Sequence, residues 1–224
     1  MAYLIKVWDL PTRLFHWALV LLMLGAVLSV LVFENMVWHA NCGYALAALW
    51  LFRLLWGVVG GHWSRFAQML FTWRQYLNCL RHPSSWTLPG HNPLGSLSVF
   101  AMLLFIGLQI VSGMASDDDA GFSGPLAAWL SNTWVAKATL YHAEIGKWVL
   151  LFLVALHLLA IAYHERIHQR RLVKPMFSGF QWQPHEAPAS QDRWRHRLLG
   201  LLVCAVCALM VYLGLQLAQG FTWQ

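Results

Sequence analysis

Five long apolar stretches alternate with shorter polar segments along the chain. Each has close to the about 20 residues that an α-helix needs to cross a 30 Å hydrocarbon core. This pattern predicts an all-α membrane protein, in which a four-helix transmembrane bundle is followed by a fifth, C-terminal transmembrane helix. The expected spans are residues 17–33, 41–59, 94–114, 140–163 and 198–217.

Composition supports a membrane protein. Of the 224 residues, 59% are hydrophobic and only 11% are charged, with a mean hydropathy of +0.53, whereas a soluble domain carries about 25% charged residues. The net charge of +6 therefore matters through its distribution, and we expect no nucleic-acid partner. The first apolar stretch directly follows Arg13 and lacks a small-residue cleavage site, so we expect it to remain as a span.

The basic residues predict the orientation of the chain. Positive charges concentrate in cytoplasmic segments of membrane proteins, and here they lie before the first span, between the second and third, and between the fourth and fifth. The alternate segments carry mainly acidic residues and tryptophans. We therefore expect a cytoplasmic N-terminus and a periplasmic C-terminus. The basic residues are Lys6, Arg13, Arg65, Arg74, Arg81, Arg166, Arg170, Arg171, Lys174, Arg193, Arg195 and Arg197.

Two connecting segments have recognisable character. The run at residues 62–77, HWSRFAQMLFTWRQYL, mixes aromatic and basic residues and predicts an amphipathic helix on the inner membrane surface. Residues 116–137 are acidic and rich in glycine and tryptophan, and we expect a short periplasmic loop there.

Histidines recur at two depths in the spans. His142 and His157 lie on the fourth span, fifteen residues apart, which corresponds to a rise of about 22 Å and a turn of about 60° beyond four full turns. His16 starts the first span on the cytoplasmic side, and His39 starts the second on the periplasmic side. We therefore expect His39 to face His142 near the periplasm. By the same reasoning, His16 faces His157 near the cytoplasm.

Ionisable side chains inside a membrane are costly and usually functional. Two imidazoles fill both axial positions of a haem iron, which gives an electron carrier rather than an oxygen-binding site. The pattern thus predicts two b-type haems, with the four histidines as iron ligands. No C-x-x-C-H motif occurs, so covalent c-type haem is excluded by that signature. The C-x-x-C at Cys204 and Cys207 fits small residues within an apolar helix.

Three of the four histidines also have a structural explanation when each is considered alone, whereas His157 lies in an apolar run with no nearby charge. His16 can be an interfacial residue, His39 a loop residue and His142 a surface residue at a helix start. His164 lies near the same level as His157 and is an alternative ligand. We favour His157, because His164 adjoins charged residues at the water boundary.

A buried arginine accompanies the expected inner site. Arg53 follows His39 by fourteen residues, so it lies about 21 Å deeper and within about 40° of the same helix face. It can pair with a haem propionate, or it can snorkel to the inner interface. Arg13 is a second propionate candidate. His91 and Asn92 lie at the inner mouth of the third span, where they can serve a quinone or haem site or simply start the helix.

Four motifs carry a family resemblance. The run WDLPTRLFHW occupies residues 8–17, the second span contains H-x3-GY from 39 and R-x2-WG-x2-G from 53, and GHNPLG opens the third span. Over about residues 5–180 these resemble the prokaryotic cytochrome b561 and Ni,Fe-hydrogenase b-type cytochrome family. The resemblance implies haem ligands on spans 1, 2 and 4 and electron exchange with membrane quinone. The ligands carry over to His16, His39, His142 and His157.

The leading hypothesis is a di-haem b-type cytochrome that transfers electrons between the quinone pool and a redox partner, such as a c-type cytochrome, and acts as a quinol:acceptor oxidoreductase. Its core is residues 1–180, and residues 181–224 form a cytoplasmic linker and the extra helix. The acidic run Asp117–Asp119 either docks a basic cytochrome or forms a solvated turn. An alternative is a membrane-anchor subunit of a hydrogenase-like dehydrogenase, and a homodimer is a further option. A non-redox transporter fits less well, because the spans lack a carboxylate relay.

Overall fold

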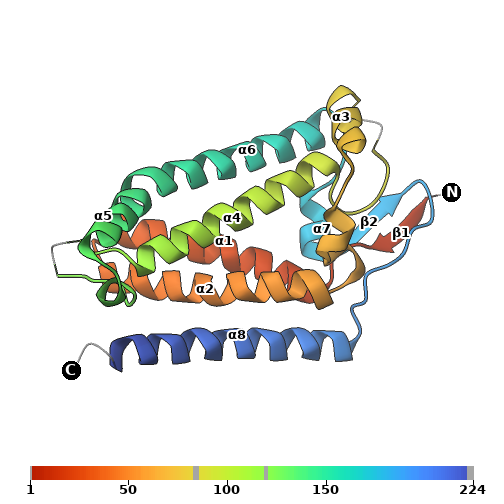
Figure 1. The fold of residues 1–224 in the computed structure, drawn as a ribbon. Helices are drawn as coiled ribbons and strands as arrows, with labels where there is room; N and C mark the ends of the chain where they lie inside the picture. Colours follow the sequence, from red (N-terminus) through yellow and green to blue (C-terminus); the bar gives the residue numbers. More distant parts are fainter. Residues whose placement is uncertain (1, 83–85, 119–120, 221–224) are drawn as a thin grey trace. The chain divides into compact units, whose positions relative to one another are not determined.

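The computed structural model describes residues 2–82, 86–118 and 121–220, and Figure 1 shows its helices and strands. Within these residues, five helical segments are long and apolar enough to cross a membrane. The five-span prediction is therefore confirmed. The segments are α1 (Leu10–Leu31), α2 (Met36–Val59), α4 (Pro93–Met114), Asn132–Arg166 and α8 (Trp194–Gly220).

The fourth span has three parts. α5 (Asn132–Leu140) continues through a π-helical segment, η5 (Tyr141–Gly146), into α6 (Lys147–Arg166). The expected loop at residues 116–137 is wrong at its end, because α5 already begins at Asn132. The rest of that loop contains a 3-10 turn, η4 (Ala127–Trp129), and a bridge between Asp117 and Ser123.

Local capping explains where several helices begin. Asp9 precedes α1 and accepts a hydrogen bond from the Thr12 backbone N–H at 2.8 Å, which satisfies a free donor of the first turn. This cap starts α1 seven residues before the expected span. Asn92 accepts from the Gly95 N–H at 2.6 Å, and Pro93 opens α4. The helix-start interpretation of Asn92 is thus confirmed.

The connection after α2 is less regular than expected. The amphipathic helix predicted over residues 62–77 is wrong for most of its length, because two 3-10 turns, η1 (His62–Ser64) and η2 (Phe66–Met69), occupy that part. The helix α3 (Trp73–Arg81) follows, and a capping box between Thr72 and Gln75 sets its start. Buried Trp63, Ser64 and Met69 hold the turns against the protein rather than along a surface.

A two-stranded antiparallel sheet was not predicted. β1 (Tyr3–Lys6) pairs with β2 (Phe180–Gln183), with Tyr3 opposite Gln183 and Lys6 opposite Phe180. The short helix α7 (Val173–Ser178) precedes β2 and ends at Gly179, whose φ of 84° is left-handed and so favours glycine. Four-residue strands are too short for a clear periodicity, which explains the omission.

The chain groups into two compact units, and each is described by itself. The first, here called unit 1, contains residues 1–16, 53–101 and 153–203. The second, unit 2, contains residues 17–52, 102–152 and 204–224. Unit 1 includes β1, β2, α3 and α7, whereas unit 2 includes α5 and η5.

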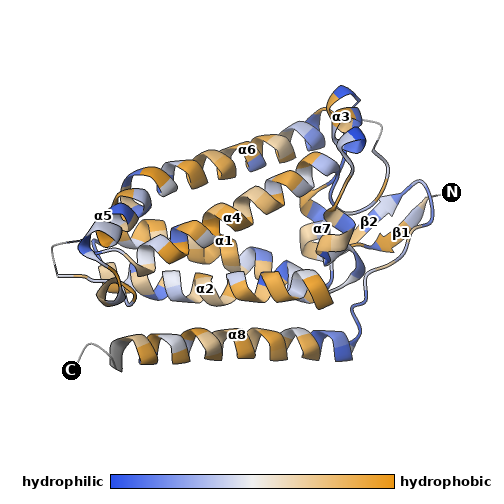
Figure 2. Cartoon of the chain, in the orientation of Figure 1, coloured by the Kyte–Doolittle hydropathy of each residue, from blue (hydrophilic) through white to orange (hydrophobic). Residues whose placement is uncertain are grey.

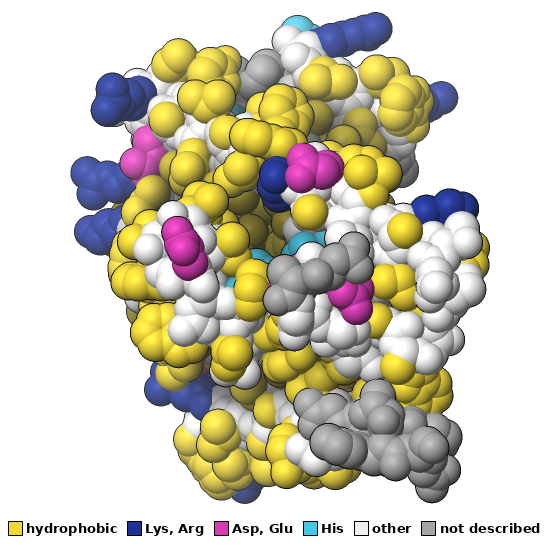
Figure 3. Space-filling model, turned by 90° about the vertical axis from the view of Figure 1, so that its left-hand side faces the viewer, with side chains coloured by type: hydrophobic (Ala, Val, Ile, Leu, Met, Phe, Trp, Pro, Cys, Tyr) yellow, Lys and Arg dark blue, Asp and Glu magenta, His cyan; other side chains and the backbone are white. Residues whose placement is uncertain are grey.

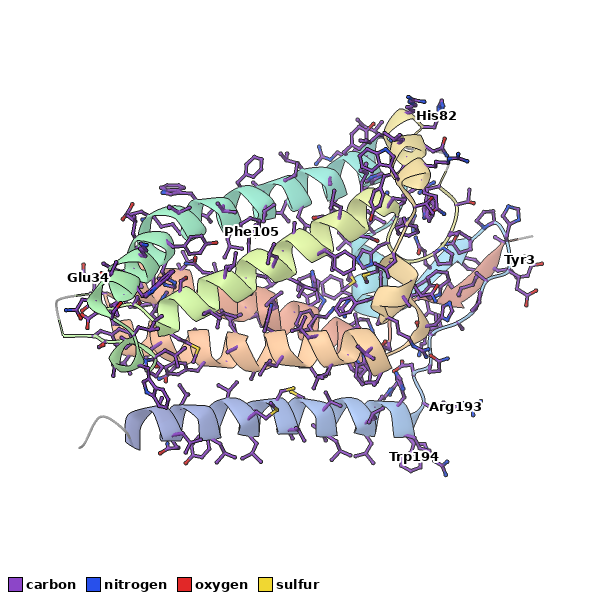
Figure 4. The ribbon with its side chains drawn as sticks, in the orientation of Figure 1. Tyr3, Glu34, His82, Phe105, Arg193 and Trp194 are labelled. Atoms are coloured by element: carbon purple, nitrogen blue, oxygen red, sulfur yellow. The ribbon has the colours of Figure 1, made fainter. Side chains whose placement is uncertain are left out.

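The long helices expose apolar side chains. Figure 2 shows hydrophobic residues along every candidate span. Leu21, Leu31 and Leu104 are 67%, 76% and 58% exposed, and the view in Figure 3 is likewise dominated by hydrophobic side chains. Such surfaces are typical of helices that face lipid rather than water.

Candidate functional site

Unit 2 brings together two of the predicted ligands. The rings of His39 on α2 and His142 in η5 have centroids 5.8 Å apart and an interplanar angle of 81°. His39 Nδ1 lies 2.9 Å from the Ala26 carbonyl oxygen, and His142 Nδ1 lies 2.9 Å from the Gln109 carbonyl oxygen. Both rings are therefore held at Nδ1 by the backbone.

This geometry fits a bis-histidine haem. With Nδ1–H donating to a carbonyl, each neutral ring presents its Nε2 lone pair to a metal. A metal–imidazole bond of about 2.0–2.1 Å puts the centres of two rings on opposite sides of one iron about 6 Å apart. The observed 5.8 Å agrees with that spacing.

Space for a flat macrocycle is present beside His39. Gly43 lies one helical turn after His39, and a Cβ built at Gly43 would meet no described atom within 4 Å. By contrast, Gly25 faces Cys42 Sγ at 3.3 Å, so it serves helix packing. Figure 3, which views the molecule from the side on which α5 lies, shows histidine side chains in a hollow that is bordered mainly by hydrophobic side chains, with charged side chains at one edge.

Two residues of α4 that lie close to His142 were not predicted from the sequence. Gln109 on α4 also donates from its side-chain Nε2 to the His142 carbonyl oxygen at 3.0 Å. Gly113 lies one turn further, where a Cβ would approach His142 Cε1 to 2.6 Å. A lone amide in an apolar span is the signal that would have indicated Gln109.

Unit 1 holds the other pair. His16 on α1 and His157 on α6 lie close enough to interact electrostatically. His164, the alternative ligand, instead contacts the rings of Tyr163 and His168, at centroid distances of 5.5 and 5.4 Å. These contacts favour His157 over His164 as the partner of His16.

A third histidine belongs to the same cluster. His91 interacts electrostatically with Arg53, His157 and His16, and its ring lies 4.9 Å from that of Trp8. Burial lowers the pKa of His91 to about 3, with further lowering by Arg53 and the two histidines. His91 is therefore neutral at ordinary pH.

The two candidate arginines differ in their surroundings. Arg53 is 4% exposed, stacks over the Phe66 ring at 4.7 Å and places Nη2 4.0 Å from Met69 Sδ. Its guanidinium thus lies inside unit 1, which disfavours the snorkelling alternative. Arg13 donates from Nη1 to the Phe177 carbonyl oxygen.

Comparison with known proteins identifies the family. A family model described as prokaryotic cytochrome b561 matches residues 7–179. The chain belongs to this family. It is a membrane cytochrome b, which functions in electron transport with haem b as its cofactor. No solved structure matches the chain significantly.

Curated relatives of this cytochrome b bear one name, "Probable Ni/Fe-hydrogenase B-type cytochrome subunit". The protein from Bradyrhizobium diazoefficiens is 26% identical over 211 residues, which cover 78% of this chain and 85% of the relative. Those from Azotobacter chroococcum and Azotobacter vinelandii are 25% and 24% identical, with 82% of this chain and 91% of each relative covered.

In this cytochrome b, the signature at residues 8–17 has a structural role. Asp9 is fully buried, and its carboxylate accepts hydrogen bonds from four groups. One is Trp56 Nε1, at 3.1 Å. The Trp56 ring in turn lies 4.8 Å from that of His196 at the start of α8.

Proposed function

We propose that this cytochrome b carries two non-covalent b-type haems, one in each unit, and passes electrons between the quinone pool and a redox partner. The observation that supports this most is the arrangement of His39 and His142, whose Nδ1 atoms are both engaged by backbone carbonyls. The ring centroid spacing of 5.8 Å suits iron between the two Nε2 atoms. Haem iron supplies reversible one-electron transfer.

The residues of the chain hold and tune these groups. His39 and His142 are the outer ligands, and His16 and His157 are the inner ligands. Arg53, which is buried in the same unit as the inner pair, neutralises a propionate of the inner haem. Arg13 is a second candidate for this role, although it already donates to the Phe177 carbonyl.

The topology proposed for the chain follows its basic residues. The N-terminus is cytoplasmic, the C-terminus is periplasmic and the membrane is the bacterial inner membrane. The outer pair then lies toward the periplasm and the inner pair toward the cytoplasm. Residues 1–180 form the di-haem core, and residues 181–224 add a cytoplasmic linker and the fifth helix.

A pyridine haemochrome assay with redox titration of the purified protein tests this function. We expect two haems b per chain and two separable potentials. His39→Leu removes one haem and leaves the other spectrally intact, whereas His185→Leu, in an exposed position, keeps both. A wild-type sample without a Soret band would contradict the function. Loss of both haems from His39→Leu would contradict separate sites.

The names of the relatives favour a second candidate. As a membrane-anchor cytochrome b subunit, the chain would pass electrons between quinone and a hydrogenase-like dehydrogenase. Affinity purification from membranes separates the two. A co-purified metal-containing subunit supports the anchor, whereas quinol oxidation by the isolated chain with a c-type cytochrome as acceptor supports an independent oxidoreductase. The mass of the purified complex tests for a homodimer.

A further inference from the structure

Arg53 is a buried cation without a counter-ion in the part of the chain that the structure describes. Its side chain is 96% removed from solvent, since it is 4% exposed. No described carboxylate forms a salt bridge with it, and its Nη1 has no hydrogen-bond partner among the described residues. The sulfur of Met69 at 4.0 Å is a weak acceptor. A buried charge left this way is costly, so an anion is expected beside it.

Asp9 interacts electrostatically with Arg53, but its two carboxylate oxygens already accept four hydrogen bonds from other groups. Its Oδ1 accepts from Thr12 N and Trp56 Nε1, at 2.8 and 3.1 Å. Its Oδ2 accepts from Gly61 N and Ser64 Oγ, at 3.1 and 2.7 Å. The Asp9 carboxylate therefore stabilises the start of α1 and the exit of α2, and another anion has to pair with the Arg53 guanidinium.

His91 offers a second buried polar group within electrostatic range of Arg53. Its Nδ1 is buried and also lacks a hydrogen-bond partner among the described residues. The ring packs on Trp8, and Arg53 is the charged group that acts on it most strongly. The neighbouring Asn92, which caps α4, fixes the backbone at this position. A neutral histidine beside a guanidinium is a hydrogen-bond donor for a shared anion.

We propose that Arg53 and His91 together form a carboxylate clamp that binds one propionate of the inner haem. This inference rests on the proposed function, because it needs the haem held by His16 and His157. Arg53 supplies the charge, and His91 donates a hydrogen bond from Nδ1. Trp8 and Phe66 provide the ring faces that hold the two donors in position.

The midpoint potential of the inner haem tests the clamp. A donor to the propionate offsets its negative charge, and without that donor the ferric state gains stability. We expect His91→Phe, which keeps the packing on Trp8, to lower the equilibrium constant for reduction of the inner haem about three- to tenfold. For one electron, a tenfold decrease corresponds to a midpoint potential lower by about 59 mV. His91→Gln restores part of the loss, because its amide still donates. His62→Phe is the matched control, since His62 also adjoins a tryptophan, Trp63, at 4.8 Å.

Haem dimethyl ester, which has no carboxylates, identifies the bound group. In protein reconstituted with the ester, we expect wild type and His91→Phe to share one inner potential. A shift that persists with the ester overturns the clamp, as does an unchanged potential in His91→Phe with ordinary haem. Loss of the inner low-spin spectrum in His91→Phe would show that His91 is an axial ligand, and this result also overturns the clamp. The spectrum of the outer haem in the same sample reports whether the variant is folded. If no His91 variant folds, the wild-type protein alone tests the clamp: equal inner potentials with haem and with haem dimethyl ester overturn it. A wild-type protein with fewer than two haems contradicts the proposed function instead.

Discussion

Gln109 contacts His142 at two points. Its backbone carbonyl oxygen lies 2.9 Å from His142 Nδ1, and its side-chain Nε2 donates to the His142 carbonyl oxygen at 3.0 Å. One residue of α4 thus holds both the ring and the backbone of a ligand that lies in a π-helical segment. Such segments often occur at functional sites, and here the lost regularity of the helix is compensated by the amide of Gln109.

Replacing Gln109 by Leu tests this support. The backbone contact to Nδ1 remains, so the outer haem still binds, but the His142 backbone loses its hydrogen bond. We expect about tenfold weaker haem binding at the outer site, in the range for residues that orient a metal ligand. Titration of apoprotein with haem, with the inner site as internal reference, measures the change. If the Gln109→Leu variant bound haem at both sites with the wild-type affinity, Gln109 would have no such role.

Gly113→Ala should displace His142 directly. The added Cβ would lie 2.6 Å from His142 Cε1 and 2.8 Å from Nδ1, closer than real Cβ contacts allow. We expect loss of most of the outer haem, visible as half the haem content with an intact inner spectrum. The matched change is Gly214→Ala on α8, where a Cβ meets no described atom within 4 Å and helix propensity favours Ala by about 1 kcal/mol. Full haem content in Gly113→Ala would contradict the close approach.

The sequence predicts the spans well because their signal is simple. A membrane helix needs about 20 apolar residues, and all five candidate spans meet this requirement within the described residues. The ends are harder to predict, since they depend on single contacts. The cap by Asp9 lengthens α1, and the early start of α5 replaces part of an expected loop. The acidic run is only partly described, because Asp119 lies outside the described residues.

The candidate site was likewise only partly predictable from the sequence. Depth and helix period predicted the pairing of His39 with His142, and the structure brings those rings to 5.8 Å. The backbone carbonyls that hold the two rings, such as that of Ala26, were not predictable, because a backbone carbonyl has no sequence signature. His91 was ambiguous for another reason. Its motif fits a helix start, and only the folded chain brings it within electrostatic range of Arg53.

Asp9→Asn tests the polar network under the inner site. An amide nitrogen in place of the oxygen that Gly61 N and Ser64 Oγ donate to leaves the Gly61 N–H facing another donor, and the Ser64 hydroxyl loses its charged acceptor. Because hydrogen bonds to a buried charged group are strong, we expect a loss of about 3 kcal/mol in the free energy of unfolding. Thermal unfolding in detergent measures it. Asp118→Asn is the control, since Asp118 is exposed and accepts from Phe122 N, and it should change stability by less than about 0.5 kcal/mol. A comparable loss in both variants would contradict the network.

Asp192 makes the attachment of the linker to β1 dependent on pH. It accepts from Lys6 Nζ at 2.6 Å, from Arg197 at 3.0 Å and from the Leu10 N–H at 3.1 Å. Burial alone would raise the pKa of Asp192, but the hydrogen bonds from Arg197, Lys6 and Leu10 together with the charge of Lys6 outweigh it and lower the pKa to about 2 from 3.8. Because the folded pKa is below the unfolded one, the stabilisation is complete above about pH 4 and disappears as the pH falls toward 2. Solvent screening limits it to about 1 kcal/mol.

Hydrogen exchange of the β1–β2 amides at several pH values measures this dependence. Wild type should lose protection between about pH 4 and pH 2, whereas Asp192→Asn, which cannot ionise, should exchange faster at pH 7 and show no further loss over that range. Glu144→Gln is the control, because Glu144 forms an exposed pair with Lys147 at 3.6 Å in a different unit and should leave the profile unchanged. If Asp192→Asn kept the acid-dependent loss of wild type, another carboxylate would have to be responsible, since Lys6 and Arg197 remain charged throughout.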